Sequence, residues 1–169
     1  MNARLPVKND FSHFYNISFL VAILLTVMSL VGVMFQAALY LTEEMRFSSV
    51  ATDLVNLFIV LPVLLGSMAL ARRGKLIGLL FCPGALFIVT YHYLAYAIAF
   101  TSLWQFVIYL LLVLLSVYTI YGWLSSVDAL SVQEQLAGKV PERFAGGVLA
   151  GFGLLFFFWR GSVAVQSMK

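Results

Sequence analysis

The stretch ATDLVNLFIVLPVLLGSMALARRGK, residues 51–75, decides the fold class. Its apolar run holds a proline near its middle and ends on Arg72, Arg73, Gly74 and Lys75. A helix rises about 1.5 Å per residue and needs about 20 apolar residues to cross a bilayer. The run therefore predicts a membrane-spanning helix that stops at a short cationic turn, with Gly74 as the turning residue.

The composition of the whole chain agrees with this interpretation. Of the 169 residues, 63% are hydrophobic and 10% are charged, and the mean hydropathy is +1.01. Soluble domains hold roughly 45–50% apolar and 25% charged residues, so this chain could not cover itself with polar surface in water. The net charge of +3 does not indicate a nucleic-acid partner, because the Lys and Arg residues flank the apolar runs. The lipid bilayer is the expected partner.

Five segments are long and apolar enough to span a membrane. They cover residues 17–41, 50–71, 76–100, 104–124 and 144–165. A strand in hydrocarbon would leave its backbone groups unpaired, so all five are expected to be helices. The predicted fold class is all-α: a polytopic transmembrane helix bundle with five spanning helices, in a single transmembrane domain covering residues 1–169. A short cytoplasmic amphipathic helix is expected at about residues 127–137.

The distribution of Lys and Arg predicts the orientation. Seven of the ten fall on one side of the predicted spans, namely Arg4, Lys8, Arg72, Arg73, Lys75, Lys139 and Arg143. The other three, Arg46, Arg160 and Lys169, fall on the opposite side. Because cytoplasmic loops are enriched in these residues, we expect a multi-pass protein of the cell membrane with a cytoplasmic N-terminus.

Signatures of enzymes and cofactor proteins are missing from the sequence. The two histidines, His13 and His92, are predicted to lie on opposite sides of the membrane, so they cannot share a metal or a haem. The lone Cys82 has no cysteine partner, and neither Ser67 nor Ser162 sits in a G-x-S-x-G motif. We expect no catalytic residue, no metal site and no cofactor.

Polar side chains recur at a similar depth in the outer half of four predicted helices. They are Gln36, Asp53, Asn56, His92, Tyr96, Gln105 and Tyr109. On each helix, spacings of three or four residues put the polar positions on one face, with Tyr40 accompanying Gln36. Unpaired polar groups are costly in hydrocarbon, so we expect convergence between the helices.

Asp53 is the most informative member of this set. It is expected within hydrogen-bond or water-bridged reach of His92 or Tyr96, beside a cavity open to the outer face. A plainer alternative is that Asp53 only anchors the start of its helix, where the helix dipole favours a carboxylate.

Two further patterns concern helix packing. Gly147 and Gly151 form a G-x-x-x-G face, which lets helices approach closely in lipid. That face fits contacts within this chain, a homo-oligomer, or further helices missing from this chain. Pro62 and Pro83 are each expected to kink a helix.

One part of the chain resembles a known group of proteins. Residues 53–65 follow the pattern D-L-x-x-L-x-x-x-x-P-x-L-L, R-R-G follows at residues 72–74, and a tyrosine-rich helix, VTYHYLAYAI, comes next. This arrangement is similar to an uncharacterised family of bacterial and archaeal multi-pass membrane proteins. The resemblance implies that the motif recurs later in an internally duplicated protein, of which this chain looks like the N-terminal part. It implies no activity.

The sequence favours a non-enzymatic multi-pass integral membrane protein. Its predicted role is small-solute binding or permeation, or that of a subunit in a membrane complex. The alternative is a membrane-embedded enzyme or redox carrier that uses Asp53 and His92.

Overall fold

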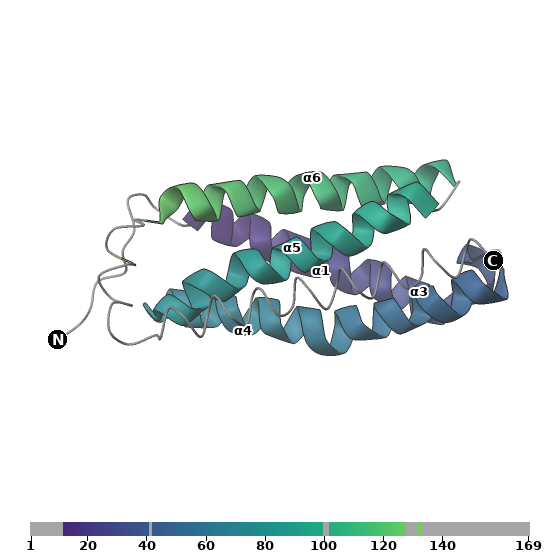
Figure 1. The fold of residues 1–169 in the computed structure, drawn as a ribbon, viewed down its shortest axis with the longest axis horizontal. Coiled ribbons are helices and arrows are strands. Elements are labelled where there is room, and N and C mark those ends of the chain that lie inside the picture. Colours follow the sequence, from purple (N-terminus) through teal and green to yellow (C-terminus); the bar gives the residue numbers. More distant parts are fainter. Residues whose placement is uncertain (1–11, 41, 100–101, 128–131, 133–169) are drawn as a thin grey trace, which may run out of the picture. The chain divides into compact units, whose positions relative to one another are not determined.

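The computed structural model describes residues 12–40, 42–99, 102–127 and 132 (Figure 1). Its helices are α1 Ser12–Met34, α2 Gln36–Leu39, α3 Glu43–Val55, the π-helical segment η1 Asn56–Val60, α4 Leu61–Arg72, α5 Leu76–Ala99 and α6 Leu103–Ser126. The chain divides into two units, residues 1–128 and 129–169, and all these helices belong to the first. No strand occurs in the described ranges, so the all-α class is confirmed there.

Among the described residues, four helices are long and apolar enough to cross a membrane. They are Ser12–Met34, Glu43–Arg72, Leu76–Ala99 and Leu103–Ser126, the second being a continuous run of α3, η1 and α4. The predicted span 144–165, with Gly147 and Gly151, lies outside the described residues. So does the predicted amphipathic helix, apart from Val127, which is extended at the end of α6, and residue 132.

The second spanning helix begins seven residues before the predicted position 50, at Glu43. Thr42 caps it, because its side chain accepts a hydrogen bond from the backbone N–H of Met45 (3.2 Å). Glu43 and Glu44 occupy the first turn, where the helix dipole favours negative charge. The cap and the acidic turn thus extend the helix beyond its apolar run.

The cationic turn between α4 and α5 has the predicted form. Gly74 has φ 74°, a left-handed conformation that glycine adopts without steric penalty. Its N–H donates to the Ala71 carbonyl (3.0 Å), and the Lys75 N–H donates to the Leu70 carbonyl (3.0 Å). This pair of bonds is the Schellman motif, which satisfies the last carbonyls of a helix. The prediction that Gly74 makes the turn is confirmed.

Glycines allow the helices to pack closely near this turn. A methyl group at Gly78 of α5 would collide with the α4 backbone at Ala71 and Ser67. A methyl group at Gly122 of α6 would collide with the Phe14 ring of α1. These two glycines therefore fix α5 against α4 and α6 against α1.

The two ends of the helix group differ, and they are called the turn end and the polar end. The turn end holds the α4–α5 turn, the start of α1 and the end of α6. There Arg72 lies over the Tyr15 ring (4.9 Å), and the Trp123 indole donates to the Ser18 hydroxyl (3.0 Å). The polar end is the opposite one, with the α2–α3 connection, the end of α5 and the start of α6 (Figure 1).

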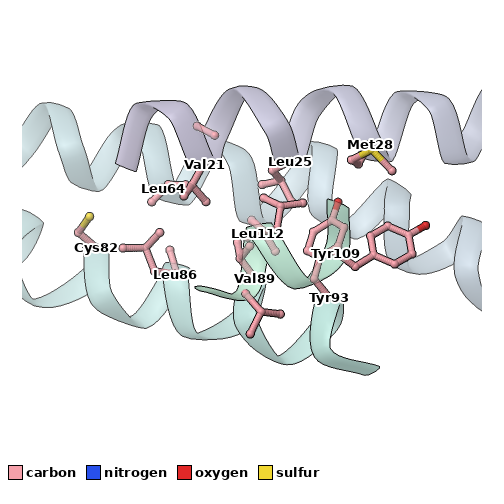
Figure 2. Close-up of a cluster of buried hydrophobic side chains, with 14 of the residues drawn as sticks. Val21, Leu25, Met28, Leu64, Cys82, Leu86, Val89, Tyr93, Tyr109 and Leu112 are labelled. Atoms are coloured by element: carbon pink, nitrogen blue, oxygen red, sulfur yellow. The ribbon is translucent and has the colours of Figure 1, made fainter. Parts of the chain in front are cut away.

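Apolar side chains from four helices fill the space between the two ends (Figure 2). They include Val21, Leu25 and Met28 of α1, Leu64 of α4, Cys82, Leu86 and Val89 of α5, and Leu112 of α6. Large apolar side chains also cover the outside, and Phe19, Phe58, Phe87 and Leu114 are each at least half exposed. So much exposed apolar surface is unusual for a soluble monomer and is suited to contact with lipid.

Candidate functional site

Polar side chains gather between the helices toward the polar end. We call the following set the polar cluster: Ser29, Tyr40, Ser49, Asp53, Asn56, His92, Tyr93, Tyr96, Gln105 and Tyr109. All are buried except His92, which is half-buried. The cluster includes every residue of the predicted set except Gln36, which is exposed on α2. The sequence thus identified which helices contribute, and named one wrong residue.

The error at Gln36 has a local cause. The predicted first span ran unbroken to residue 41, which put Gln36 and Tyr40 on one face. In the structure α1 ends at Met34, and Phe35 leaves helical geometry with φ −113° and ψ 31°. The short α2 that follows turns Gln36 outward, while Tyr40 at its end is 1% exposed and points into the cluster.

Asp53 is the charged group of the polar cluster. It is 1% exposed, and its Oδ2 accepts a hydrogen bond from the Tyr40 hydroxyl at 2.5 Å. The side chains of Ser29 and Tyr96 lie close to its carboxyl group. The Tyr40 hydroxyl is the donor in this bond, because a carboxylate oxygen can only accept.

Gly32 of α1 makes the space that the Asp53 carboxylate occupies. A methyl group at position 32 would overlap Oδ2 of Asp53 and would lie 2.7 Å from the Tyr40 hydroxyl oxygen. Ser29 lies one helical turn away on the same buried face of α1. Gly32 and Ser29 together let α1 approach a carboxylate on α3, which a bulkier helix face would exclude.

His92 pairs with Asn56 and not with Asp53. Its Nδ1 lies 2.8 Å from Oδ1 of Asn56, and with the amide in this orientation the imidazole donates. The amide nitrogen Nδ2 of Asn56 is buried and has no partner among the described residues. In the structure Tyr96 lies near Asp53, whereas His92 bonds to Asn56, which is three residues further along the chain than Asp53.

Three tyrosine rings line the α5–α6 side of the cluster. The rings of Tyr93, Tyr96 and Tyr109 are in mutual contact, with centroids 5.4–5.7 Å apart. The Tyr93 hydroxyl lies 3.3 Å from the Ser29 hydroxyl, and the Tyr96 hydroxyl donates to the Ser49 carbonyl (2.9 Å). The Tyr93 and Tyr96 hydroxyls thus connect α5 to α1 and α3, and ring contacts with Tyr109 join α6 to α5.

A widened turn of helix begins inside the cluster. Asn56 starts η1, and its carbonyl accepts from the N–H of Leu61, five residues on. The next residue, Pro62, has no N–H to continue the ordinary ladder of bonds, which explains a wide turn at this point. Where the sequence predicts a kink at Pro62, the structure has a π-helical segment that ends just before the proline. Such segments occur frequently at functional sites.

The cluster is closed toward solvent. Asp53 and Asn56 are 1% and 0% exposed, so the predicted cavity open to the outer face does not form around them. The amide nitrogen of Gln105 is buried and, within the described ranges, has no partner. Among the described residues no three His, Cys, Asp or Glu side chains come together as metal ligands would. The cluster therefore offers a carboxylate, hydroxyl groups and two unused amide donors.

Apart from Tyr40, which accompanies Gln36 in the prediction, sequence reasoning left three contributors out of the predicted set, namely Ser29, Ser49 and Tyr93. A serine or tyrosine in an apolar run gives little signal by itself, because either one is common in membrane helices and tyrosine also suits the membrane interface. Ser49 contributes through its backbone carbonyl, which no sequence pattern marks. Comparisons of the chain with protein-family models, with characterised proteins and with solved structures find no match.

Proposed function

We propose that this chain is a multi-pass integral protein of the cell membrane, oriented with its N-terminus in the cytoplasm. The four apolar helices support a membrane location. Arg72, Arg73 and Lys75 at the turn end support the orientation, because cytoplasmic loops are enriched in such residues. The polar cluster then lies in the outer half of the membrane.

Within that framework, the polar cluster is proposed to bind a small monovalent cation at Asp53. The observation that carries this proposal is a carboxylate with 1% exposure whose hydrogen-bond donor, the Tyr40 hydroxyl, is neutral. Burying a charge without a compensating partner costs roughly several kcal/mol. The same penalty appears when one partner of a buried ion pair is removed. The carboxylate therefore has to be neutralised by a proton or by a bound cation.

The groups around Asp53 favour a small, hard cation as the ligand. Carboxylate, hydroxyl and carbonyl oxygens are the donors that such ions prefer, and the cluster supplies all three kinds. The proposed role is a small-solute binding or permeation unit in which a cation exchanges with a proton at Asp53.

Other roles have less support. A membrane-embedded enzyme or redox carrier that uses Asp53 and His92 would need these two side chains to work together, and His92 is instead paired with Asn56. A role as a subunit of a membrane complex, or as a homo-oligomer, is compatible with the proposed cation site. Membership of the bacterial and archaeal family with the D-L-x-x-L-x-x-x-x-P-x-L-L pattern stays a prediction.

The test is infrared difference spectroscopy on the full chain, purified in detergent and held at fixed pH. Na⁺, K⁺ or Li⁺ replaces N-methyl-D-glucamine at constant ionic strength. Cation binding at Asp53 predicts that at least one of these ions removes the carbonyl band of a protonated carboxyl group. The Asp53→Asn variant should lack both the band and the response.

Glu44→Gln is the matched control, because it makes the same carboxyl-to-amide change at an exposed position of α3. It should keep the cation response of the wild-type protein. Thermal unfolding gives a second readout, since a cation at ten times its dissociation constant stabilises the folded state by about 1.4 kcal/mol. Equal responses of the wild-type and Asp53→Asn proteins to all three cations would rule out the proposed site.

A further inference from the structure

A groove with a volume of about 370 Å³ runs along the outward face of α3. Its lining includes Gln36, Glu43, Arg46, Phe47, Val50 and Leu54. The groove is separate from the polar cluster, because Asp53 and Asn56 face the interior while Phe47 and Leu54 are exposed. Spacings of three and four residues place its α3 residues on one side of that helix.

The groove is polar at one end and apolar along the rest of its length. Glu43 and Arg46 belong to the first turn of α3, at the polar end of the helix group. Phe47, Val50 and Leu54 follow toward the middle of the span. From Arg46 to Leu54 the helix rises about 12 Å, at about 1.5 Å per residue. Such a groove fits an amphiphile with a charged head and an extended chain.

Arg46 is the residue that indicates an occupant. It is half-buried, and its Nε is buried without a hydrogen-bond partner among the described residues. Glu43 and Glu44 lie three and two positions before it, yet neither forms an ion pair with it within the described ranges. A buried, unpaired guanidinium nitrogen is costly, so turning the Arg46 side chain toward an anionic ligand in the groove would be favourable.

We propose that this groove binds a phospholipid with a primary-ammonium, zwitterionic headgroup. The phosphate binds the guanidinium of Arg46, which is suited to paired hydrogen bonds with phosphate oxygens. The ammonium donates to the Glu43 carboxylate, the second charged group of the lining. One acyl chain lies along Phe47, Val50 and Leu54. This site is independent of the cation site at Asp53 and goes beyond the proposed function.

The headgroup charge follows from the pair of opposite charges in the groove. A purely anionic headgroup would satisfy Arg46 and be repelled by Glu43. A choline headgroup carries its positive charge on a nitrogen without N–H groups, so it cannot donate to Glu43. Phosphatidylethanolamine satisfies both side chains, and phosphatidylglycerol and phosphatidylcholine are its matched competitors.

Native mass spectrometry of the delipidated full chain in detergent tests the proposal. The protein is titrated with the three lipids, which carry identical acyl chains. The wild-type protein should bind phosphatidylethanolamine most tightly. Arg46→Gln should weaken that binding at least about tenfold, the usual effect of losing a charge-assisted hydrogen bond. Glu43→Gln should still bind phosphatidylethanolamine, but no more tightly than it binds phosphatidylcholine.

The controls separate this site from general charge effects. Glu44→Gln and Arg73→Gln make the same changes in charge at exposed positions outside the groove, and they should bind as the wild-type protein does. Ala51→Trp fills the groove without a change in charge and should weaken all three lipids. Circular dichroism checks that each variant is folded.

Two results would overturn the proposal. One is Arg46→Gln binding phosphatidylethanolamine as well as Arg73→Gln does. The other is a wild-type protein that binds phosphatidylglycerol or phosphatidylcholine as tightly as phosphatidylethanolamine.

Discussion

Replacing Gly32 with alanine should destabilise the protein by disturbing Asp53. The added methyl group would overlap Oδ2 of Asp53 and crowd the Tyr40 hydroxyl, 2.7 Å away. Neither group has free space nearby, because Asp53 and Tyr40 are each 1% exposed. The carboxylate must therefore move, and its hydrogen bond to Tyr40 is lengthened or broken.

The expected loss of unfolding free energy in Gly32→Ala follows from three effects. Overpacking a buried site costs roughly 1–3 kcal/mol, and losing a hydrogen bond to a charged group costs about 1.5–3 kcal/mol. Alanine regains about 1 kcal/mol from its higher helix propensity. We expect Gly32→Ala to lower the free energy of unfolding by roughly 2–4 kcal/mol, because overpacking and the lost bond outweigh propensity.

Denaturant unfolding in mixed detergent micelles, followed by circular dichroism, measures this change. Gly66→Ala and Gly84→Ala are the matched controls, since a methyl group at either position meets nothing within 4 Å. Combining Gly32→Ala with Asp53→Ala should recover at least about 1 kcal/mol relative to additivity, as contacting residues are coupled. If Gly32→Ala is as stable as Gly84→Ala, α1 does not approach the Asp53 carboxylate as closely as described.

Two further predictions concern the Asp53 bond and the orientation of the chain. Tyr40→Phe should lower the free energy of unfolding by about 1.5–3 kcal/mol, whereas Tyr91→Phe, on an exposed ring, should change it little. Equal losses of unfolding free energy in these two variants would show that the bond between Tyr40 and Asp53 does not stabilise the protein. In a Cys82→Ala background, a cysteine at Lys75 should react with reagent only from the cytoplasm, and one at Glu44 only from outside; the reverse pattern would invert the proposed topology.

Most of the fold could be predicted from the sequence because a lipid environment allows the backbone few structures. Every backbone group in the hydrocarbon must be paired within the segment, so a long apolar run becomes a helix. The four described spans follow this rule, and the α4–α5 turn follows equally local rules at Gly74. The start of the second span was placed too late because the capping Thr42 and the acidic first turn extend a helix beyond its apolar part.

The polar cluster was predicted in outline for the same physical reason. Polar side chains at equal depth on neighbouring helices have only one another to satisfy them, so they converge. Which atoms meet depends on features without a sequence pattern. The break at Phe35 carries Tyr40 to Asp53, and the rotation of α5 against α3 brings His92 to Asn56. Spacing identifies a helix face, but partners follow from how two faces are rotated against each other.

Both ends of the helix group carry hydrogen bonds between helices, but at the turn end Gly78 also brings two helix backbones into contact, and this difference bears on the proposed cation site. At the turn end, Gly78 and Gly122 bring backbone or ring atoms into direct contact, so the helices have no room to shift. At the polar end, hydroxyl groups hold the helices through hydrogen bonds, as between Tyr40 and Asp53. Hydrogen bonds between hydroxyls and a carboxylate can be exchanged for bonds to an ion without moving the turn end. The polar end is therefore the part of the described chain in which binding and local rearrangement are compatible with a fixed fold.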